Sequence, residues 1–296
     1  MEVCVIAARA LANIAYVKSQ EVVDAGAVPL LVKLLQLPNM EVCVIAARAL
    51  ANIAYVKSQE VVDAGALPLL VKLLQSPDME MCKKTAWALS NIAANKAREV
   101  VEAGALPLLV KLLQSSNMEM CKESAWALKN IAAVKAQEVV DAGAVPPLVK
   151  LLQSPDMEVC KYTAWTLKNI AAASLDLALA VVKAGALPLL VKLLQSPNME
   201  VCKHTAKALS NIAAVKAREV IEAGALPLLV KLLQSPNMEV CKYTAWTLKN
   251  IAAASADLAL AVIKAGGLPP LVKLLQSSNT EVCTQASLTI GKIIGI

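Results

Sequence analysis

The sequence has little of what catalysis or membrane insertion requires. It contains a single histidine, His204, no glycine-rich phosphate-binding loop, no CxxC pair and no cluster of metal-ligating side chains. Hydrophobic residues make up 57% of the chain, yet Lys, Asp, Gly or Pro interrupts every apolar stretch before about 18 residues, so no segment is long enough to span a bilayer. These absences predict a protein that is not an enzyme, holds no cofactor or metal ion, and does not cross a membrane.

What the sequence has in abundance is repetition. A block of the form M/T-E-V/M-C recurs with a spacing of 39 residues and two excursions to 42. It begins at Met1, Met40, Met79, Met118, Met157, Met199, Met238 and Thr280. A fixed period near 40 residues indicates a repeat array, which grows in one dimension and needs no internal boundary. We therefore expect one continuous domain.

Cysteine content and charge restrict the compartment and the partners. The eight cysteines occur once per repeat, which predicts buried structural thiols of the kind found in a reducing compartment, the cytoplasm or the nucleus. The net charge of +6 comes from 29 basic and 23 acidic residues, and the basic residues are spread evenly through the repeats. This modest excess ranks nucleic acid below protein as a partner.

One unit in the middle of the chain illustrates the expected local structure. Residues 135–142 form a short helix that ends at Gly143, a residue suited to a left-handed cap. A second helix over 147–153 follows a proline, which is tolerated in the first turn. Asp156 supplies an N-cap for a long third helix over 157–172.

This pattern of short, medium and long helices with glycine at the first corner resembles the armadillo-repeat family over essentially the whole chain. The resemblance implies an all-α fold, a right-handed superhelical solenoid of three-helix repeats. We expect a half-repeat at residues 1–16 that contains only a third helix, and seven repeats at residues 17–296. Residues 1–16 are apolar enough to suggest a signal peptide, but they lack a basic leader and recur from Met40, which favours a structural helix.

The third helix has one apolar side and one polar side. At about 100° per residue, the apolar side of the central unit consists of Val159, Cys160, Thr163, Ala164, Leu167, Ile170 and Ala171. Trp165 lies in the middle of the polar side. A large indole among charged residues is hard to explain by packing, so we predict that it contacts a ligand.

Three positions on the polar side define the candidate site. The tryptophan position is occupied by Arg9, Arg48, Trp87, Trp126, Trp165, Lys207, Trp246 and Leu288. The variable position, three residues earlier, is the most diverse: Ile6, Ile45, Lys84, Glu123, Tyr162, His204, Tyr243 and Gln285. The asparagine position, four residues after the tryptophan position, is Asn13, Asn52, Asn91, Asn130, Asn169, Asn211 and Asn250, and then Lys292.

The W-x-x-x-N spacing resembles the ladder of the importin-α branch of the family, in which asparagines hold the backbone of an extended ligand and tryptophans form side-chain pockets. An asparagine amide can pair with any peptide unit because it offers a donor and an acceptor, and an indole can stack on a cation. We therefore predict peptide binding by Trp87, Asn91, Trp126, Asn130, Trp165, Asn169, Trp246 and Asn250, together with Asn52, Lys84, Glu123, Tyr162, His204, Lys207, Asn211 and Tyr243.

Two alternatives stand beside this interpretation. An asparagine near a helix end can instead cap a turn or tie adjacent repeats together, and its repetition then follows from duplication. Residues 1–27 do recur identically at 40–66. The near-identity of the units also favours a structural scaffold or an engineered consensus array with no natural ligand. We interpret His204 as a surface residue, with ligand contact as its second role.

The expected partner is an extended protein or peptide segment. Each glutamate on the polar side is opposed by lysines, as Glu80 is by Lys83 and Lys84, so an acidic or mixed-charge peptide should fit better than a strongly basic one. The N-terminal half-repeat and the C-terminal Ile293, Ile294 and Ile296 leave apolar surface at both ends, which predicts self-association.

Overall fold

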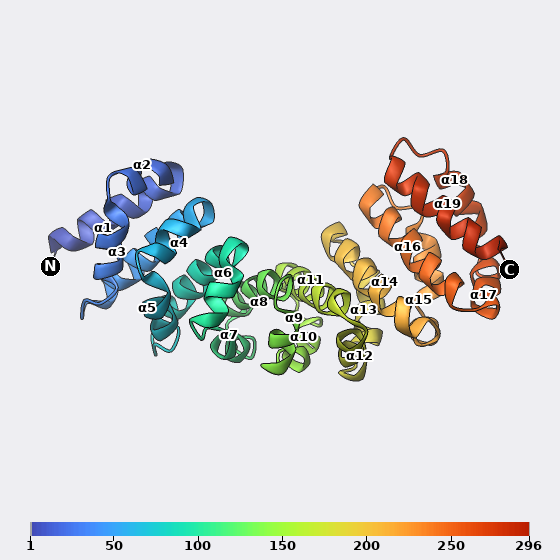
Figure 1. Ribbon diagram of the computed structural model, residues 1–296, viewed down its shortest axis with the longest axis horizontal. Coiled ribbons are helices and arrows are strands. Elements are labelled where there is room, and N and C mark those ends of the chain that lie inside the picture. The colour runs from blue at the N-terminus through green and yellow to red at the C-terminus, as the bar shows by residue number, and fades with distance from the viewer. Residues whose placement is uncertain (1, 296) are drawn as a thin grey trace. The chain divides into compact units, whose positions relative to one another are not determined.

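The computed structural model describes residues 2–295, and its contacts divide the chain into two compact units, Met1–Pro147 and Leu148–Ile296. The described residues form α-helices joined by short turns, without a strand (Figure 1). The all-α fold class that the repeats predict is therefore confirmed. None of the helices between residues 2 and 295 combines the length and apolar character needed to cross a membrane.

Each unit contains four long helices and a set of shorter ones. In the first unit the long helices are α1 (Glu2–Val17), α4 (Met40–Asp63), α6 (Met79–Glu102) and α8 (Met118–Ala132), and the short ones are α2 (Ser19–Asp24), α3 (Ala27–Leu34), α5 (Ala66–Leu73), α7 (Leu106–Leu112) and α9 (Ala136–Asp141). In the second unit the long helices are α11 (Met157–Ala173), α14 (Met199–Glu222), α16 (Met238–Ala254) and α19 (Thr280–Ile294), and the short ones are α12 (Leu175–Lys183), α13 (Ala186–Leu193), α15 (Ala225–Leu232), α17 (Ala256–Lys264) and α18 (Leu268–Leu274). The boundary falls inside α10 (Val145–Leu151).

The local signals of the central unit are confirmed. Helices α9, α10 and α11 lie within two residues of the predicted bounds. Gly143 has a φ of 77° and turns the chain between α9 and α10, in the left-handed region that glycine adopts without strain. Asp156 is the N-cap of α11, where its carboxylate accepts hydrogen bonds from the backbone N–H groups of Glu158 and Val159.

The two lengths of unit differ in how the third helix passes into the next first helix. In α4 the two helices run together through one non-helical residue, Lys57, and α6 and α14 contain the same kink at Lys96 and Lys216. In the longer units, Ser174 separates α11 from α12, which has nine residues where α9 has six. The three extra residues therefore lengthen the first helix by nearly one turn.

Stacking of the third helices builds the core. Within the first unit α1, α4, α6 and α8 pack in chain order, and within the second unit α11 packs on α14, α14 on α16 and α16 on α19 (Figure 1). The apolar side predicted for α11 is fully buried, as are its equivalents Leu50 and Ile53 on α4. Apolar side chains of this size stabilise the fold by about 1.5–3 kcal/mol each when buried.

The cysteines connect the third helix to the turn that precedes it. In each of six repeats, from Cys43 to Cys241, the thiol donates a hydrogen bond to a backbone carbonyl of that turn, with sulfur–oxygen distances of 3.0–3.2 Å. These six side chains are buried, whereas Cys4 and Cys283 are half-buried. Burial raises the pKa of the Cys160 thiol to about 11. The structural role predicted for the thiols is confirmed for these six.

Candidate functional site

The asparagine position links each third helix to the one before it. In the first unit the side-chain Nδ2 atoms of Asn52, Asn91 and Asn130 donate hydrogen bonds to backbone carbonyls of the preceding long helix, at 3.0, 2.9 and 3.0 Å. In the second unit Asn211 and Asn250 do the same, at 3.1 and 2.8 Å. Asn169 occupies this position on α11 and is half-buried.

The accepting carbonyl always belongs to the residue just before the asparagine position of the preceding helix. For Asn52 it is Ala12, and for Asn91 it is Ala51. A carbonyl oxygen inside a helix has a second lone pair beside the one that its own helix uses, so the amide adds a hydrogen bond without breaking one. Of the two roles open to these asparagines, the structure shows the one that ties adjacent repeats together.

The variable position also lies at the contact between neighbouring third helices. His204 is 5% exposed and stacks on the indole of Trp165 from the preceding repeat, with ring centroids 4.1 Å apart. Tyr243 occupies the variable position of the next repeat and contacts Lys207 of α14, whose Nζ lies 3.2 Å from the tyrosine hydroxyl oxygen. The interpretation of His204 as a surface residue is wrong, because the side chain at the preceding tryptophan position covers it.

The other residues predicted to bind at the variable position range from buried to half-buried. Glu123 is 4% exposed, whereas Lys84, Tyr162 and Tyr243 are half-buried. The diversity of this position therefore reflects at least in part the packing of one repeat on the next. On an isolated helix these side chains lie on the polar side. In the stack, the neighbouring third helix packs against that side and covers them, and we call this contact between adjacent third helices the seam.

All four tryptophans are half-buried, and each lies under a lysine of its own helix. The ammonium groups of Lys84, Lys129, Lys168 and Lys249 lie 5.7, 6.0, 5.3 and 5.4 Å from the ring centroids of Trp87, Trp126, Trp165 and Trp246. A lysine over an indole face is attracted by the ring quadrupole. The tryptophans therefore combine a packing role with partial exposure.

A surface pocket in the first unit brings predicted residues together. It has a volume of about 300 Å³ and is lined by Ala12, Asn13, Tyr16, Arg48, Asn52 and Trp87. Asn52 and Trp87 come from the predicted set, and Arg48 donates a hydrogen bond to the side-chain oxygen of Asn13 at 3.1 Å. Arg48 is not among the predicted residues, although it occupies the tryptophan position of α4.

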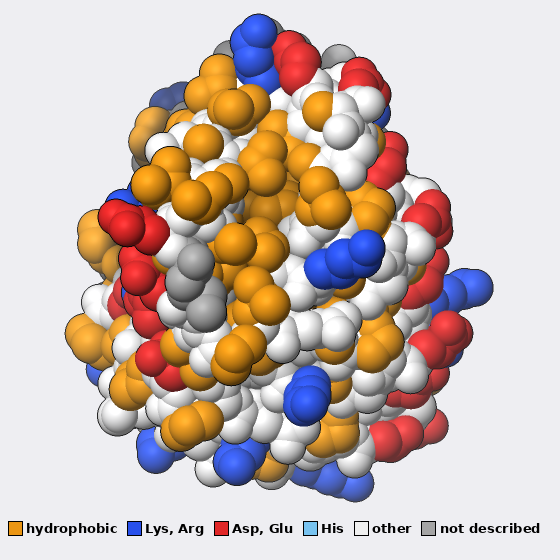
Figure 2. All heavy atoms as spheres, turned by 90° about the vertical axis from the view of Figure 1, so that its left-hand side faces the viewer, with side chains coloured by type: hydrophobic (Ala, Val, Ile, Leu, Met, Phe, Trp, Pro, Cys, Tyr) orange, Lys and Arg blue, Asp and Glu red, His pale blue; other side chains and the backbone are white. Residues whose placement is uncertain are grey.

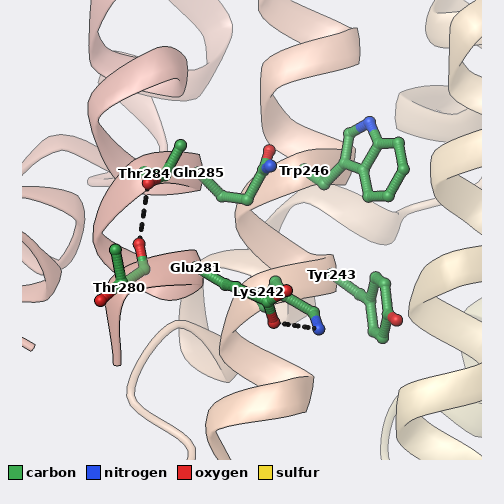
Figure 3. A pocket seen from close by; sticks show the side chains of 7 residues that line it. All are labelled: Lys242, Tyr243, Trp246, Thr280, Glu281, Thr284 and Gln285. Atoms are coloured by element: carbon green, nitrogen blue, oxygen red, sulfur yellow. Dashed lines mark hydrogen bonds and ion pairs between the residues drawn. The ribbon is translucent and has the colours of Figure 1, made fainter. Parts of the chain in front are cut away.

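A second pocket, of about 310 Å³, lies between α16 and α19 in the second unit (Figure 3). Its lining residues are Lys242, Tyr243, Trp246, Thr280, Glu281, Thr284 and Gln285. In Figure 3 the rings of Tyr243 and Trp246 project to the same side of α16, and Gln285 extends from α19 toward Trp246. Gln285 is not among the predicted residues, although it occupies the variable position of α19.

Ion pairs neutralise the acidic residues of this surface. Glu80, Glu119, Glu158, Glu200 and Glu239 each pair with a lysine one turn later on the same helix. Lys242 also bridges to Glu281 on α19 at 2.9 Å (Figure 3). Partial burial lowers the pKa of Lys242, but its hydrogen bonds to Glu239 and Glu281 outweigh that effect and hold the pKa above its usual value.

Two lysines of the second unit are left without such a partner. Among residues 2–295, Lys207 and Lys249 form no ion pair with a carboxylate, and their ammonium groups lie against the rings of Tyr243 and Trp246 instead. Around α14 and α16 this surface therefore carries two lysines, Lys207 and Lys249, whose charge is not paired with a carboxylate of the described residues.

Glu123 is the most deeply buried carboxylate of the candidate site. It accepts a hydrogen bond from the hydroxyl of Ser90 at 3.2 Å, and the ammonium of Lys122 lies 3.6 Å away. Desolvation raises the pKa of Glu123, and the opposing effects of Lys122 and Ser90 do not cancel it. The ionised carboxylate is thus less stable in the folded chain than in the unfolded one.

We expect Glu123→Gln to raise the unfolding temperature at about pH 7, and this gain to vanish as the pH falls below the ordinary glutamate pKa of 4.5. A raised folded-state pKa means that the ionised group costs stability above that pKa and costs nothing once protonated in both states. Thermal unfolding followed by circular dichroism between about pH 3.5 and 8 checks this. Glu60→Gln, at a partly exposed site, is the control and should show no such trend. A gain for Glu123→Gln that did not depend on pH would contradict the assignment.

Comparison with known protein families identifies repeats along nearly the whole chain. The Armadillo/beta-catenin-like repeat matches residues 18–55, 57–94, 95–133, 135–172, 176–214, 216–253 and 255–294. No curated protein matches the sequence.

Solved structures of designed proteins are similar to the chain. The crystal structure of an engineered protein is 44% identical over 98% of this chain and 74% of its own, with a TM-score of 0.93. A designed armadillo repeat protein in complex with the peptide (KR)4 is 38% identical over 77% of this chain and 99% of its own, with a TM-score of 0.72. Computationally designed armadillo repeat proteins for modular peptide recognition are represented by a structure 39% identical over 76% of this chain and 99% of its own, with a TM-score of 0.73.

Proposed function

Because the chain belongs to the armadillo-repeat family, we propose that it binds an extended peptide along the exposed side of its third helices. The observation that carries the proposal is the pair of pockets on that side, one beside Trp87 and one beside Trp246. The similar designed protein bound to (KR)4 and the designs for modular peptide recognition support this class of ligand. The proposed role is binding and not catalysis.

The roles of the site residues follow from their contacts. The half-buried indoles offer their exposed part to ligand side chains. The asparagines use an N–H group to hold the preceding helix, so the group left for a ligand is the side-chain oxygen, which can accept a backbone N–H. An extended chain advances about 3.3 Å per residue and third helices pack about 8–10 Å apart, so successive repeats would meet every second or third ligand residue.

The ligand is proposed to be acidic or of mixed charge. Glu200, Glu239 and Glu281 are paired with lysines of the chain, whereas Lys207 and Lys249 have no carboxylate partner among the described residues. A carboxylate on the ligand would therefore meet an available cation near α14 and α16. A lysine on the ligand would have to compete with the chain's own lysines for these glutamates.

Titration of two fluorescent peptides of equal length, one with alternating Glu and one with alternating Lys, tests both parts of the proposal. We expect the acidic peptide to bind about 2- to 30-fold more tightly, since each of two exposed ion pairs contributes about 0.2–1 kcal/mol. Salt should narrow the difference, because such attraction is screened over about 10 Å at 0.1 M. The double variant Lys207→Glu/Lys249→Glu should reverse the order, and Lys192→Glu/Lys231→Glu on the short helices is the matched control.

Tighter binding of the basic peptide would overturn the charge preference and leave peptide binding intact. Binding of neither peptide by a folded chain would favour a second role, that of a structural scaffold or engineered array without a ligand of its own. That role is supported by the asparagines, whose N–H groups join repeat to repeat in the unliganded chain.

Two further proposals concern the surroundings of the protein. The six buried thiols, held as hydrogen-bond donors, support a reducing compartment, the cytoplasm or the nucleus.

Apolar side chains exposed on the outer third helices support self-association: Ile6 on α1 is 62% exposed and Ile294 on α19 is 69% exposed. Of the three C-terminal isoleucines predicted to be exposed, Ile293 is buried, which corrects that prediction, and Ile296 lies outside the described residues.

A further inference from the structure

Two identical segments of the chain show how a neighbouring helix changes the exposure of the same side chains. Residues 1–27 and 40–66 are identical in sequence, so α1 and the third-helix part of α4 carry the same side chains in different surroundings. Helix α4 packs between α1 and α6, whereas the described helices that pack on α1, namely α2 and α4, both follow it in the chain. Ile6 is 62% exposed and its copy Ile45 is 8% exposed. Ala10 is exposed and its copy Ala49 is fully buried.

The hydrogen bonds between repeats define which stripe of a third helix faces the preceding one. Three positions of the stripe contact the preceding helix in successive repeats: the variable position, as in His204, the position after the tryptophan position, as in Thr247, and the asparagine position, as in Asn250. On α1 these positions are Ile6, Ala10 and Asn13, and all three are exposed. We call these three residues the leading stripe. Figure 2 faces the end of the molecule that carries α1, and hydrophobic side chains gather on this face.

Helix α19 exposes the complementary stripe. The preceding helix of each pair contributes the backbone carbonyl before the tryptophan position, as Ala206 and Ala245 do, and the carbonyl before the asparagine position, as Ser210 does. On α19 the equivalent residues are Ser287 and Gly291, which with Leu288 between them are exposed. We call Ser287, Leu288 and Gly291 the trailing stripe. Ala245, which is the counterpart of Ser287 on α16, is fully buried against α19.

Building on the self-association proposed above, we infer that a second copy of this chain joins the first head to tail, with the leading stripe of one copy on the trailing stripe of the other. The two stripes are the two halves of a contact that each unit already forms within itself, from α1 on α4 to α16 on α19. Small side chains at Ala10, Ser287 and Gly291 allow the helices to approach closely. Asn13 of the second copy then donates to the carbonyl of Gly291, as Asn52 does to Ala12.

One position in this contact opposes association. Within the chain, Arg48 donates to the side-chain oxygen of Asn13 on the preceding helix. In the head-to-tail contact, Arg9 of the second copy takes the place of Arg48, and Lys292 takes the place of Asn13. Two cations meet where the internal contact has a hydrogen bond. Association should therefore be weaker than the contact between internal repeats, and it should strengthen when salt screens this repulsion.

Sedimentation velocity of the 296-residue chain over a concentration series of about 1–100 µM tests self-association, because interfaces of ordinary size begin to bind in this range. We expect the mass to rise with concentration above that of the 31.1 kDa monomer. Ala10→Lys blocks the leading stripe, and Gly291→Lys blocks the trailing stripe at a helical glycine where an added Cβ meets nothing within 4 Å. Each variant alone should remain monomeric, and Leu30→Lys, which changes an exposed residue of α3, should associate like the original chain.

A mixture of the two blocked variants decides the polarity. Ala10→Lys retains a free trailing stripe and Gly291→Lys a free leading stripe, so the equimolar mixture should form a one-to-one complex and nothing larger, as expected for a heterologous contact. Lys292→Asn should tighten association severalfold, because Arg9 of the second copy gains an acceptor.

The remaining outcomes overturn specific parts of the inference. A chain that stays monomeric at every concentration would contradict self-association itself, whatever its affinity for peptides. Association that only one of the two blocking variants abolishes would show a symmetric contact between like ends, and a mixture that fails to form the complex would contradict the head-to-tail arrangement.

Discussion

Asn91→Asp is expected to destabilise the chain by about 3–5 kcal/mol at neutral pH, the cost of leaving an uncompensated charge in the interior. Asn91 is 2% exposed and donates through Nδ2 to the carbonyl of Ala51. An ionised aspartate has no hydrogen to donate and places its negative charge against that carbonyl oxygen. Chemical denaturation monitored by circular dichroism measures the loss.

The pH dependence of this variant identifies the cause. Burial next to an acceptor raises the pKa of the new carboxyl group, so the full cost applies above that pKa and shrinks as the pH falls toward the ordinary aspartate value of about 3.9. A protonated carboxyl can donate to Ala51 as the amide does. Asn13→Asp is the matched control, because Asn13 is exposed and accepts from Arg48. An equal loss in both variants would show that the link between repeats has no special importance.

Trp246→Ala is expected to weaken binding of the acidic peptide by about 1–3 kcal/mol, roughly a 5- to 150-fold rise in Kd. Its indole lines the pocket between α16 and α19 beside Tyr243, with Lys249 over the ring (Figure 3). Removing it deletes the largest side chain that lines the pocket and the ring that Lys249 lies against. Fluorescence anisotropy of the labelled peptide gives the affinity.

Two control variants separate lost binding from lost packing. Trp246→Phe keeps a ring in the seam and should retain part of the affinity. Tyr55→Ala removes an aromatic side chain that is 70% exposed on α4 and should leave the affinity unchanged. If Trp246→Ala unfolds at the same temperature as the original chain and binds the peptide equally well, this pocket is not part of the binding surface.

Local features of the fold followed directly from the sequence. The turn at Gly143 and the N-cap at Asp156 depend on backbone conformation and on hydrogen bonds between residues two or three apart, so the residue types predict them. The apolar side of α11 follows from helical periodicity, and its burial required only that some neighbour cover it. The extra turn of α12 follows from three added residues.

Contacts between repeats could not be derived in the same way. The periodicity of one helix separates its polar side from its apolar side, but it does not reveal which polar residues a neighbouring helix covers. His204 and Glu123 were predicted to face a ligand and are buried in the seam. The amide of Asn91 was assigned to a ligand backbone and donates to Ala51, forty residues earlier. Burial of such groups depends on the distance and rotation between stacked helices.

The sequence by itself determined the repeat, its three helices, the caps and the apolar side, because these depend on periodicity and on interactions within a few residues. Tertiary structure alone decided which side chains on the polar face remain accessible. The identical residues Ile6 and Ile45 make the distinction plain: one is largely exposed and the other buried, although every local interaction available to them is the same. The difference arises because burial depends on whether another helix packs against that side, and a residue's own sequence neighbours do not contain that information.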